Sequence, residues 1–303
     1  MKYLVTGGAG FIGSALVDRL INQGHEVIVI DNLFSGKKEN INPKAKFFNL
    51  DICDFEKIKP IFEGIDFVYH LAAIPRVFFS VKNPVETSKT NILGTVNVFK
   101  ASADAGAKRV VFISSSAVYG DQKKMPIKET AEKNPMSPYA LQKLVGEQTA
   151  KLFTELYKLP IVCLRFFNVY GPRIDFDSEY GLVIGKFLHL KSQNKPLTIY
   201  GDGKQTRGFC YVDDVADACI KAMESEKLSG GEIINVSREE SYSVNQIADA
   251  IGGERIYLPA REGDPINTKA DIGLAKKLLG WKAMVNLEDG IKKTKEWMDK
   301  NQG

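Results

Sequence analysis

The chain has 303 residues, of which 44% are hydrophobic and 26% are charged. This composition is typical of a globular protein and excludes a disordered chain, a collagen-like chain and a disulfide-rich small protein. The 41 Lys and Arg residues against 37 Asp and Glu residues leave a formal charge of +4 without any long block of like charges, so nucleic-acid binding is not expected. The length suits one large domain or two modest domains.

Membrane insertion and disulfide formation are not expected either. No apolar run approaches the roughly 18–20 residues that span a bilayer, and the first expected strand begins at about Lys2, which leaves no room for a signal peptide. We therefore expect a cytoplasmic protein. Four cysteines without a CxxC pair are expected to be reduced thiols: Cys53, Cys163, Cys210 and Cys219. Three histidines lack metal-ligand spacing, so no metal is expected: His25, His70 and His189.

The first half of the chain alternates short apolar runs with helical patterns. The apolar runs predict strands at Tyr3–Thr6, Glu26–Ile30, Lys46–Leu50, Phe67–Leu71, Val110–Ser114 and Ile161–Phe166. Helical periodicity predicts helices at Gly13–Gln23, Pro84–Ala105 and Pro138–Tyr157. Continuous apolar strands that alternate with helices predict an α/β fold, namely a doubly wound parallel sheet of the Rossmann type with both faces covered.

After about Asn168 the segments become shorter. Glycine turns at Tyr200–Gly203 and Gly252–Gly253 accompany helical patterns at Asp214–Met223, Val244–Ala250, Ile272–Leu279 and Leu287–Met298. We expect these segments to form a smaller α/β substrate lobe over the carboxyl edge of the sheet. The predicted division is a first domain at residues 1–167 and this lobe at 168–303, with some later segments returning to the first domain.

A glycine-rich turn follows the first strand and opens the first helix. Its glycines, Gly7, Gly10 and Gly13, allow the backbone to approach a pyrophosphate. The helix N-terminus adds N–H groups and a positive dipole. This context predicts a dinucleotide site.

The acidic ends of the next two strands indicate which dinucleotide binds. Asp31 can accept hydrogen bonds from the ribose hydroxyls of NAD and would repel the extra phosphate of NADP. No arginine lies within residues 31–40, although Lys37 and Lys38 do. NAD is therefore the predicted cofactor, with Asp51 and Ile52 placed to reach the adenine.

Tyr139 and Lys143 lie four residues apart and share one face of the expected helix. A phenol with a pKa near ~10 is a poor base at neutral pH, but a nearby ammonium group lowers that pKa. Ser114, Ser115 and Ser116 end the preceding strand, at the edge where ligands of such sheets bind. A hydroxyl there can relay a proton or hold a substrate oxygen, and we expect at least one of the three to serve only as a turn or helix cap.

Together these motifs resemble the extended short-chain dehydrogenases/reductases, and among them the nucleotide-sugar epimerases and dehydratases. Further segments carry the likeness over nearly the whole chain: His70–Ala73, Asn91–Thr95, Ser114–Gly120, Arg165–Pro172 and Arg261–Asp264. It is greatest to the UDP-glucose 4-epimerases and their relatives that use UDP-N-acetylglucosamine. The resemblance implies a bound NAD, a UDP-sugar substrate and a homodimer formed through the long helices near residues 84–105 and 138–157.

The resemblance also implies the role of each site residue. Catalysis would fall to Ser115, Tyr139 and Lys143, with Ser116 as the second candidate for the catalytic serine. The residues that would contact NAD are Gly7, Gly10, Phe11, Ile12, Gly13, Asp31, Asn32, Ser35, Gly36, Asp51, Ile52, Leu71, Ala72, Ala73, Asn91, Tyr139, Lys143 and Phe167. The residues that would contact the UDP-sugar are Ser115, Ser116, Asn168, Arg207, Arg261, Asp264 and Thr268, the two arginines on the phosphates.

The implied reaction is transient oxidation of the sugar to a 4-ketone, rotation of the ketone, and reduction on its other face with NAD retained. Dehydratase relatives carry an Asp-Glu pair where this chain has Ser116 and Ala117, and decarboxylase relatives carry a glutamate at the second of these positions. Dehydration and decarboxylation are therefore not expected.

The sugar is less narrowly defined. Thr268, seven residues after Arg261, is small, which implies a pocket open to N-acetyl sugars as well as to glucose. UDP-glucuronate stays open, because some epimerases of that substrate have a threonine here and Arg76, in the aromatic loop 74–80, could meet a carboxylate. A reductase, an epimerase at another carbon and a non-catalytic NAD(P)-sensing protein are the remaining alternatives.

Overall fold

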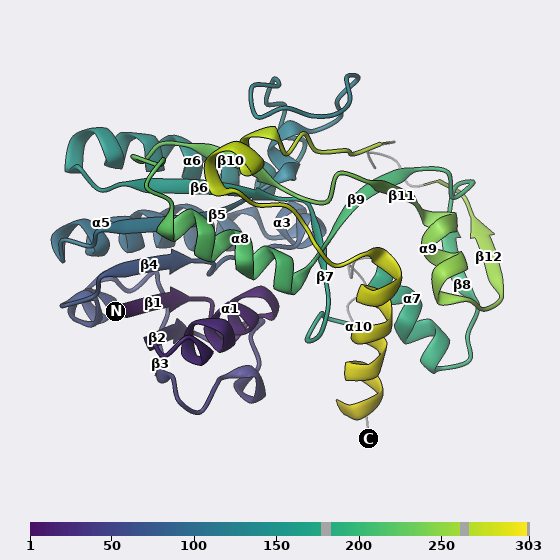
Figure 1. Cartoon of the computed structure of the whole chain (residues 1–303), viewed down its shortest axis with the longest axis horizontal. Coiled ribbons are helices and arrows are strands. Elements are labelled where there is room, and N and C mark those ends of the chain that lie inside the picture. Colours follow the sequence, from purple (N-terminus) through teal and green to yellow (C-terminus); the bar gives the residue numbers. More distant parts are fainter. Residues whose placement is uncertain (177–182, 261–266, 302–303) are drawn as a thin grey trace.

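The computed structural model describes residues 1–176, 183–260 and 267–301. Its central feature is a seven-stranded parallel sheet with the strand order β10-β6-β5-β4-β1-β2-β3 (Figure 1). The first half of the chain supplies β1 Lys2–Thr6, β2 Glu26–Asp31, β3 Lys46–Asn49, β4 Phe67–His70, β5 Arg109–Ser115 and β6 Ile161–Phe166. The predicted Rossmann arrangement is confirmed, because the chain reverses direction across the sheet between β1 and β4.

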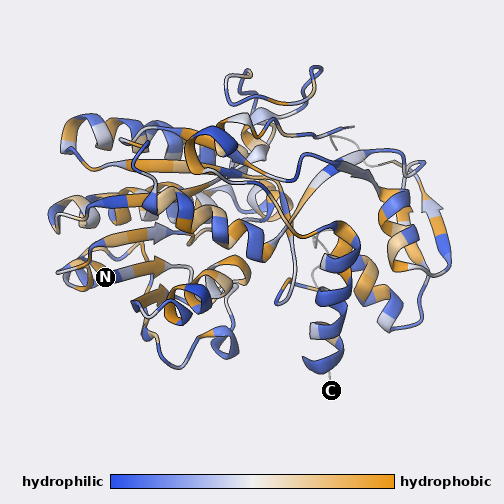
Figure 2. Ribbon diagram, in the orientation of Figure 1, coloured by the Kyte–Doolittle hydropathy of each residue, from blue (hydrophilic) through white to orange (hydrophobic). Residues whose placement is uncertain are grey.

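Helices cover both faces of this sheet. On one face α1 Phe11–Asn22 packs beside α8 Val212–Glu224, and on the other face α2 Phe55–Ile58, α5 Thr95–Asp104 and α6 Pro138–Tyr157 pack together. Side chains alternate between the faces, so Tyr3 and Val5 join one buried cluster whereas Leu4 joins the other. The hydrophobic strands lie between these two layers of helices (Figure 2).

The seventh strand, β10 Ile233–Val236, comes from the second part of the chain and pairs with β6. Helix α8 also comes from that part. The division of the chain into domains at residue 167 stays a prediction.

The remaining elements form a second lobe beside the carboxyl edge of the sheet (Figure 1). Its strands are β7 Asn168–Tyr170, β9 Thr206–Tyr211 and β11 Ser241–Ser243 in one small sheet, and β8 Leu197–Tyr200 and β12 Arg255–Leu258 in another. Its helices are α7 Val183–Ser192, α9 Val244–Ile251 and α10 Leu287–Asn301. Short turns complete the fold: η1 Lys38–Asn40, η2 Lys59–Phe62, η4 Ser116–Tyr119 and the π-helical η5 Ala275–Leu279.

Two segments differ from the predicted elements. The expected single helix over 84–105 is divided into α4 Pro84–Ser88, the π-helical turn η3 Lys89–Gly94 and α5. In η3 the Asn91 side chain bonds the main chain of Ile74, and Gly94 lies so close to Ile52 that an added Cβ would be 2.6 Å from its Cδ1. The aromatic segment interpreted as a loop instead begins a helix, α3 Val77–Lys82.

A buried ion pair joins α6 to the centre of the sheet. Glu147 on α6 receives two hydrogen bonds from Arg165 on β6, Nε to Oε1 at 2.7 Å and Nη2 to Oε2 at 2.6 Å, and both residues are at most 3% exposed. Ser114 on β5 donates a third hydrogen bond to Glu147, at 2.5 Å. Arg165 also donates to the Tyr119 hydroxyl, which in turn donates to Asn235 on β10, both at 2.7 Å.

All four cysteines are free thiols, and Cys163, Cys210 and Cys219 are buried. Within residues 1–176, 183–260 and 267–301 no helix is both long enough and apolar enough to cross a membrane.

The buried pair generates a stability prediction. Glu147→Gln leaves the Arg165 guanidinium without a counter-charge in the interior, which costs about 3–5 kcal/mol of unfolding free energy. Urea unfolding followed by circular dichroism measures this loss.

Glu155→Gln is the matched control, because Glu155 lies on the same helix and forms only an exposed ion pair with Lys151 at 3.9 Å. The control should change the unfolding free energy by less than about 1 kcal/mol. Equal effects of the two substitutions would show that the buried pair does not hold α6 in place.

Candidate functional site

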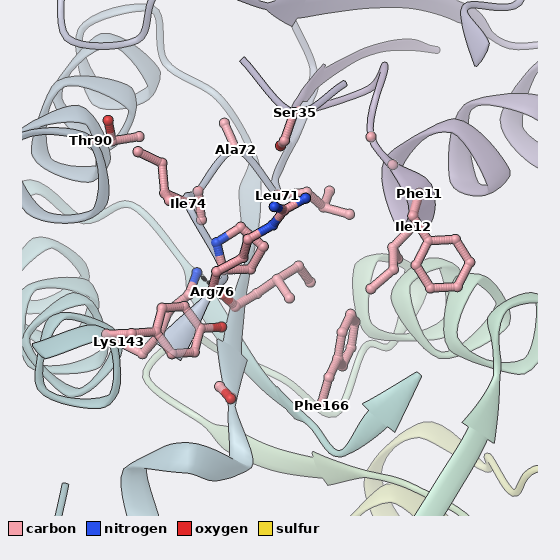
Figure 3. Close-up of a pocket in the computed structure, with 18 of the residues that line it drawn as sticks. Phe11, Ile12, Ser35, Leu71, Ala72, Ile74, Arg76, Thr90, Lys143 and Phe166 are labelled. Atoms are coloured by element: carbon pink, nitrogen blue, oxygen red, sulfur yellow. Dashed lines mark hydrogen bonds between the residues drawn. The ribbon is translucent and has the colours of Figure 1, made fainter. Parts of the chain in front are cut away.

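A cavity of about 1150 Å³ opens at the carboxyl ends of the sheet strands, where the second lobe approaches them. Doubly wound sheets bind their ligands at this edge, beside the point where the strand order reverses. Figure 3 shows Phe11 and Ile12 of α1 on one side of the cavity and Lys143 of α6 on the other. The space between them is therefore walled by both halves of the Rossmann sheet.

The glycine turn forms one wall of this cavity. Gly7 has φ +76°, and an added Cβ there would lie 2.7 Å from the Ala72 nitrogen. A Cβ on Gly13 would lie 2.1 Å from the Gly7 oxygen, so both positions require glycine. Gly10 precedes α1 without any side-chain cap. The first turn of that helix therefore keeps its backbone donors for an anionic ligand.

Two carboxylates lie at the ends of the neighbouring strands β2 and β3. Asp31 is 8% exposed and accepts hydrogen bonds from the backbone N–H of Ala9 at 3.0 Å and of Leu33 at 2.8 Å. Burial raises its pKa, while those two hydrogen bonds act in the opposite direction. The fixed Asp31 side chain suits the ribose of a dinucleotide.

Asp51 accepts hydrogen bonds from the Cys53 N–H at 2.8 Å and from the Asn32 amide at 3.2 Å. Partial burial opposes the effect, but these bonds hold the pKa of Asp51 below its usual range. The Asp51 side chain thus stabilises the turn that follows β3, and it also lines the cavity.

Ser115, Tyr139 and Lys143 meet on the opposite wall. The Ser115 side chain lies near enough to the Tyr139 phenol to favour a lower phenol pKa, and the Ser115 hydroxyl accepts a hydrogen bond from the Ala117 N–H at 3.1 Å. The Lys143 ammonium donates to the Ile113 carbonyl at 2.7 Å and lies 6.0 Å from the centroid of the Tyr139 ring. Ser114 is buried and donates to Glu147, whereas the helix cap expected of one of the three serines is formed by Ser115, which caps η4.

Burial is the largest influence on both titratable groups. It raises the pKa of Tyr139 to about 12, against the opposite influence of the Ser115 side chain, and it lowers the pKa of Lys143 to about 8. The lowering of the tyrosine pKa that was expected from the lysine is therefore not seen, and burial dominates. Both shifts disfavour the charged forms, and a cation beside the phenol would act in the opposite direction by favouring the phenolate.

Helix α3 helps to position Tyr139. The Ser80 hydroxyl accepts a hydrogen bond from the Tyr139 N–H at 3.1 Å and donates to the Val77 carbonyl at 2.6 Å. Ser137 caps α6 by accepting from the Ala140 N–H at 3.2 Å. Sequence reasoning missed Ser80, which is the one hydroxyl in the aromatic run 74–80.

The substrate side of the cavity includes Asn168, Arg207 and Thr268. The Asn168 amide donates to the Gly208 carbonyl at 3.0 Å, and Arg207 donates to the Thr206 carbonyl at 2.9 Å. The Thr268 hydroxyl is buried and lacks a hydrogen-bond partner within the described part of the chain. Arg261 and Asp264 lie outside the described residues.

All other predicted site residues line the cavity, except Asn91. Its amide bonds both main-chain groups of Ile74, at 2.8 and 3.1 Å, and Gln142 at 2.7 Å. Asn91 thus lies behind the wall and holds it in place, and direct contact with NAD stays a prediction. The preceding residues Lys89 and Thr90 do line the cavity, although they were not predicted to. Their position in the sequence next to the Asn91 motif could have indicated this.

Comparison with known proteins identifies the family of this chain. A model of the NAD dependent epimerase/dehydratase family matches residues 3–237. The chain belongs to this family. Its 43% identity over 306 residues to a Methanocaldococcus jannaschii protein, provisionally named UDP-glucose 4-epimerase, extends over 98% of each sequence.

Solved structures of similar epimerases agree with this assignment. The UDP-glucose 4-epimerase of Thermotoga maritima, solved with UDP-glucose, has 39% identity and a TM-score of 0.95 with complete coverage of both chains. The UDP-glucuronic acid 4-epimerase of Bacillus cereus, solved with UDP-glucuronic acid and NAD, has 34% identity and a TM-score of 0.90 over 99% of each chain. The relatives of this epimerase/dehydratase therefore differ in the sugar they bind.

The site of this epimerase/dehydratase fits NAD, the cofactor of its family. The glycine turn leaves room for a pyrophosphate at the N-terminus of α1. Asp31 stands at the end of the next strand. Residues 31–40 contain no arginine, and Lys37 is the one basic residue among them that lines the cavity. Within the described residues no group of three or more His, Cys, Asp or Glu side chains is arranged to hold a metal ion.

Asp31 supplies a test of cofactor recognition. Asp31→Asn removes a charged acceptor for the ribose hydroxyls, so the Kd for NAD should rise roughly 10- to 100-fold. Because the repulsion of an additional phosphate is also lost, the preference for NAD over NADP should decrease. Calorimetric titration of cofactor-free protein with both dinucleotides measures the two constants.

A purely structural defect at Asp31 would weaken the binding of both dinucleotides equally. An unchanged ratio of the two Kd values would therefore contradict the assigned contact with the ribose.

Proposed function

We propose that this NAD-dependent UDP-sugar epimerase/dehydratase is a UDP-hexose 4-epimerase. Its substrates are UDP-glucose and UDP-galactose, and also UDP-N-acetylglucosamine and UDP-N-acetylgalactosamine. One observation carries this proposal: Ser115, Tyr139 and Lys143 line the same cavity as the glycine turn. A proton acceptor and a dinucleotide site thereby face the same space.

The side chains of this set have separate tasks. Tyr139 accepts the proton of the sugar hydroxyl as the C4 carbon is oxidised and returns it when that carbon is reduced. Ser115, beside the phenol, holds the same hydroxyl or relays its proton, and Lys143 stabilises the phenolate. NAD held at the glycine turn and Asp31 would supply the acceptor and donor of the hydride, and its positive ring would favour the phenolate as well. Since the two half-reactions cancel, the cofactor need not leave.

The residues after Ser115 support epimerisation over elimination or decarboxylation. Ser116 and Ala117 line the cavity beside it and carry no carboxyl group. The acidic side chains that line the cavity in the described part of the chain are Asp31, Asp51, Glu86 and Asp175. Asp31 ends β2 and Asp51 follows β3, and both of these strands are separated from β5 by β4 and β1 in the sheet.

Recognition of the substrate would involve both lobes. Arg207 and Arg261 would pair with the diphosphate, and Asn168 and Asp264 would bind the rest of the sugar nucleotide. Thr268 is small and lines the cavity, which supports a pocket that also admits an acetamido group. UDP-glucuronate is the second candidate substrate, because Arg76 lines the same cavity and a similar epimerase binds that sugar.

We further propose a homodimer formed through α6 and the neighbouring helices. Leu141, Leu152 and Leu156 are exposed on one face of α6, and Leu93 of η3 and Val85 of α4 are exposed on elements packed against it. A run of apolar side chains along a helix face is typical of a covered surface.

Epimerisation is tested without added NAD. Purified protein is incubated separately with UDP-glucose, UDP-N-acetylglucosamine and UDP-glucuronate, and the 4-epimers are separated by chromatography. Formation of the galacto epimers of the first two is expected. Tyr139→Phe should lower turnover at least 1000-fold and keep NAD bound, because only the proton acceptor is removed.

Failure to convert any of the three substrates, even with NAD added, would contradict the proposal. Consumption of NADH or NADPH under the same conditions would instead support a reductase. A Tyr139→Phe variant with most of the activity would disprove the role of the phenol.

The dimer predicts that sedimentation equilibrium gives twice the mass of one chain. Leu152→Glu should shift the protein toward the monomer, because a charge in a covered apolar face is poorly solvated. Met284→Glu is the control, since Met284 is exposed in a different part of the molecule. Equal masses for the wild type and Leu152→Glu would remove the basis for this interface.

A further inference from the structure

Two chain segments meet across the strand that leads into the glycine turn. One segment follows β2 and contains Phe34, and the other follows β4 and contains α3 with Phe79. In the sheet β1 lies between β2 and β4, and the glycine turn follows β1. The Phe34 and Phe79 rings nevertheless meet edge to face, with their centroids 5.9 Å apart. Their contact therefore joins the two segments over the start of the dinucleotide site.

This contact lies at the opening of the cavity. Phe34 lines the cavity and is 52% exposed, so its ring stands between the cavity and the solvent. Phe79 is not among the residues that line the main cavity, and it supports Phe34 from outside. The two segments enclose a second, smaller cavity of about 170 Å³, which is lined by Phe34, Ser35, Ile74, Pro75, Arg76 and Phe79.

Both segments also carry predicted contacts to NAD. Asn32 and Ser35 flank Phe34, the residues 71–73 precede α3, and all of them line the main cavity. Figure 3 shows Ser35 and Leu71 on the same side of the cavity, together with the Arg76 side chain. A dinucleotide held by these residues would lie inward of the Phe34–Phe79 contact.

Hydrogen bonds fix the backbone on each side of the contact. The Asp31 carboxylate accepts from the Leu33 N–H at 2.8 Å, and the Asn32 side chain accepts from the Phe34 N–H at 3.0 Å. On α3 the Phe79 carbonyl accepts from the Asn83 N–H at 2.8 Å. The two rings thus meet because each backbone is held in place next to a predicted contact with the cofactor.

A second contact joins the α3 segment to the second lobe. Arg76, the residue before α3, bonds the carboxylate of Asp175 in the segment after β7, and both residues line the main cavity. Their side chains are 40% and 45% exposed, so this pair also stands at the opening. The α3 segment is therefore attached on two sides, to the turn after β2 through Phe79 and to the second lobe through Arg76.

We propose that the Phe34–Phe79 and Arg76–Asp175 contacts form a clasp that retains NAD. Both contacts must open before the cofactor leaves, and this adds a barrier to its dissociation. An aromatic pair and an exposed ion pair are weak interactions, so the clasp opens without unfolding of the protein. The inference concerns the cofactor of the family and does not depend on which sugar is epimerised.

The experiment measures the release of NAD from the holoenzyme. Wild type, Phe79→Ala, Asp175→Ala, the double variant and the control Tyr257→Ala are loaded with NAD and mixed with an excess of isotopically labelled NAD. Mass spectrometry of the protein-bound cofactor follows the exchange, and calorimetric titration of cofactor-free protein gives the Kd. Tyr257 is a matched control, because it is an exposed aromatic residue on β12 that does not line the cavity.

Phe79→Ala should raise the dissociation rate of NAD roughly tenfold, the factor that corresponds to about 1.4 kcal/mol of barrier. The Kd should change less than about threefold, because a clasp slows entry as well as exit. Asp175→Ala should act in the same direction, and the double variant should release NAD faster than either single variant. Tyr257→Ala should keep the wild-type rate.

An unchanged dissociation rate in either single variant would overturn the inference. A rise in the dissociation rate with an equal rise in Kd would also overturn it, because the substitution would then have removed a binding contact and no barrier. An equal effect of Tyr257→Ala would show a general loosening of the protein. Conversion of UDP-glucose by the wild type with NAD in excess is measured separately, so a failure of the clasp is distinguished from a failure of the proposed function.

Discussion

The relative placement of Ser115, Tyr139 and Lys143 depends on the buried Glu147–Arg165 ion pair. Glu147 follows Lys143 by one helical turn, and Ser114, which also bonds Glu147, directly precedes Ser115. The pair therefore fixes α6 and the end of β5 relative to each other, and with them the phenol, the ammonium and the hydroxyl. Two ions in the interior carry a large desolvation cost, so this contact stabilises one relative position rather than a family of similar ones.

A second buried network holds the opposite wall. The Ala72 N–H donates to Thr6, and the Thr6 hydroxyl donates to His70 Nδ1 at 2.7 Å. The other ring nitrogen, Nε2, then donates to the Thr95 hydroxyl at 3.0 Å, because that hydroxyl donates its own proton to the Asn91 carbonyl. This chain of donors requires a neutral ring, and burial lowers the pKa of His70 to about 3. One hydrogen-bond network thus connects the His70 and Asn91 motifs and holds residues 72–74 in place.

Much of this arrangement could be predicted from local patterns. Continuous apolar strands and glycine turns depend on neighbours in sequence, so the sheet and the pyrophosphate site followed from them. The divided helix at Lys89–Gly94 did not, because its cause is the distant contact of Asn91 with Ile74. The Arg76–Asp175 pair joins residues 99 positions apart. Nothing in the sequence around either residue distinguishes it from a charged residue exposed to solvent. Partners that meet only in the folded chain leave no local signal.

Burial also explains why the catalytic pair cannot be judged from its spacing alone. The i, i+4 spacing places Lys143 beside Tyr139, yet the same burial that brings them together raises the pKa of the phenol to about 12 and lowers that of the ammonium to about 8. Low polarity penalises each charge separately and strengthens the attraction between opposite charges once both are present. A further positive charge in this space, such as the ring of bound NAD would supply, would therefore act with Lys143 to favour the phenolate.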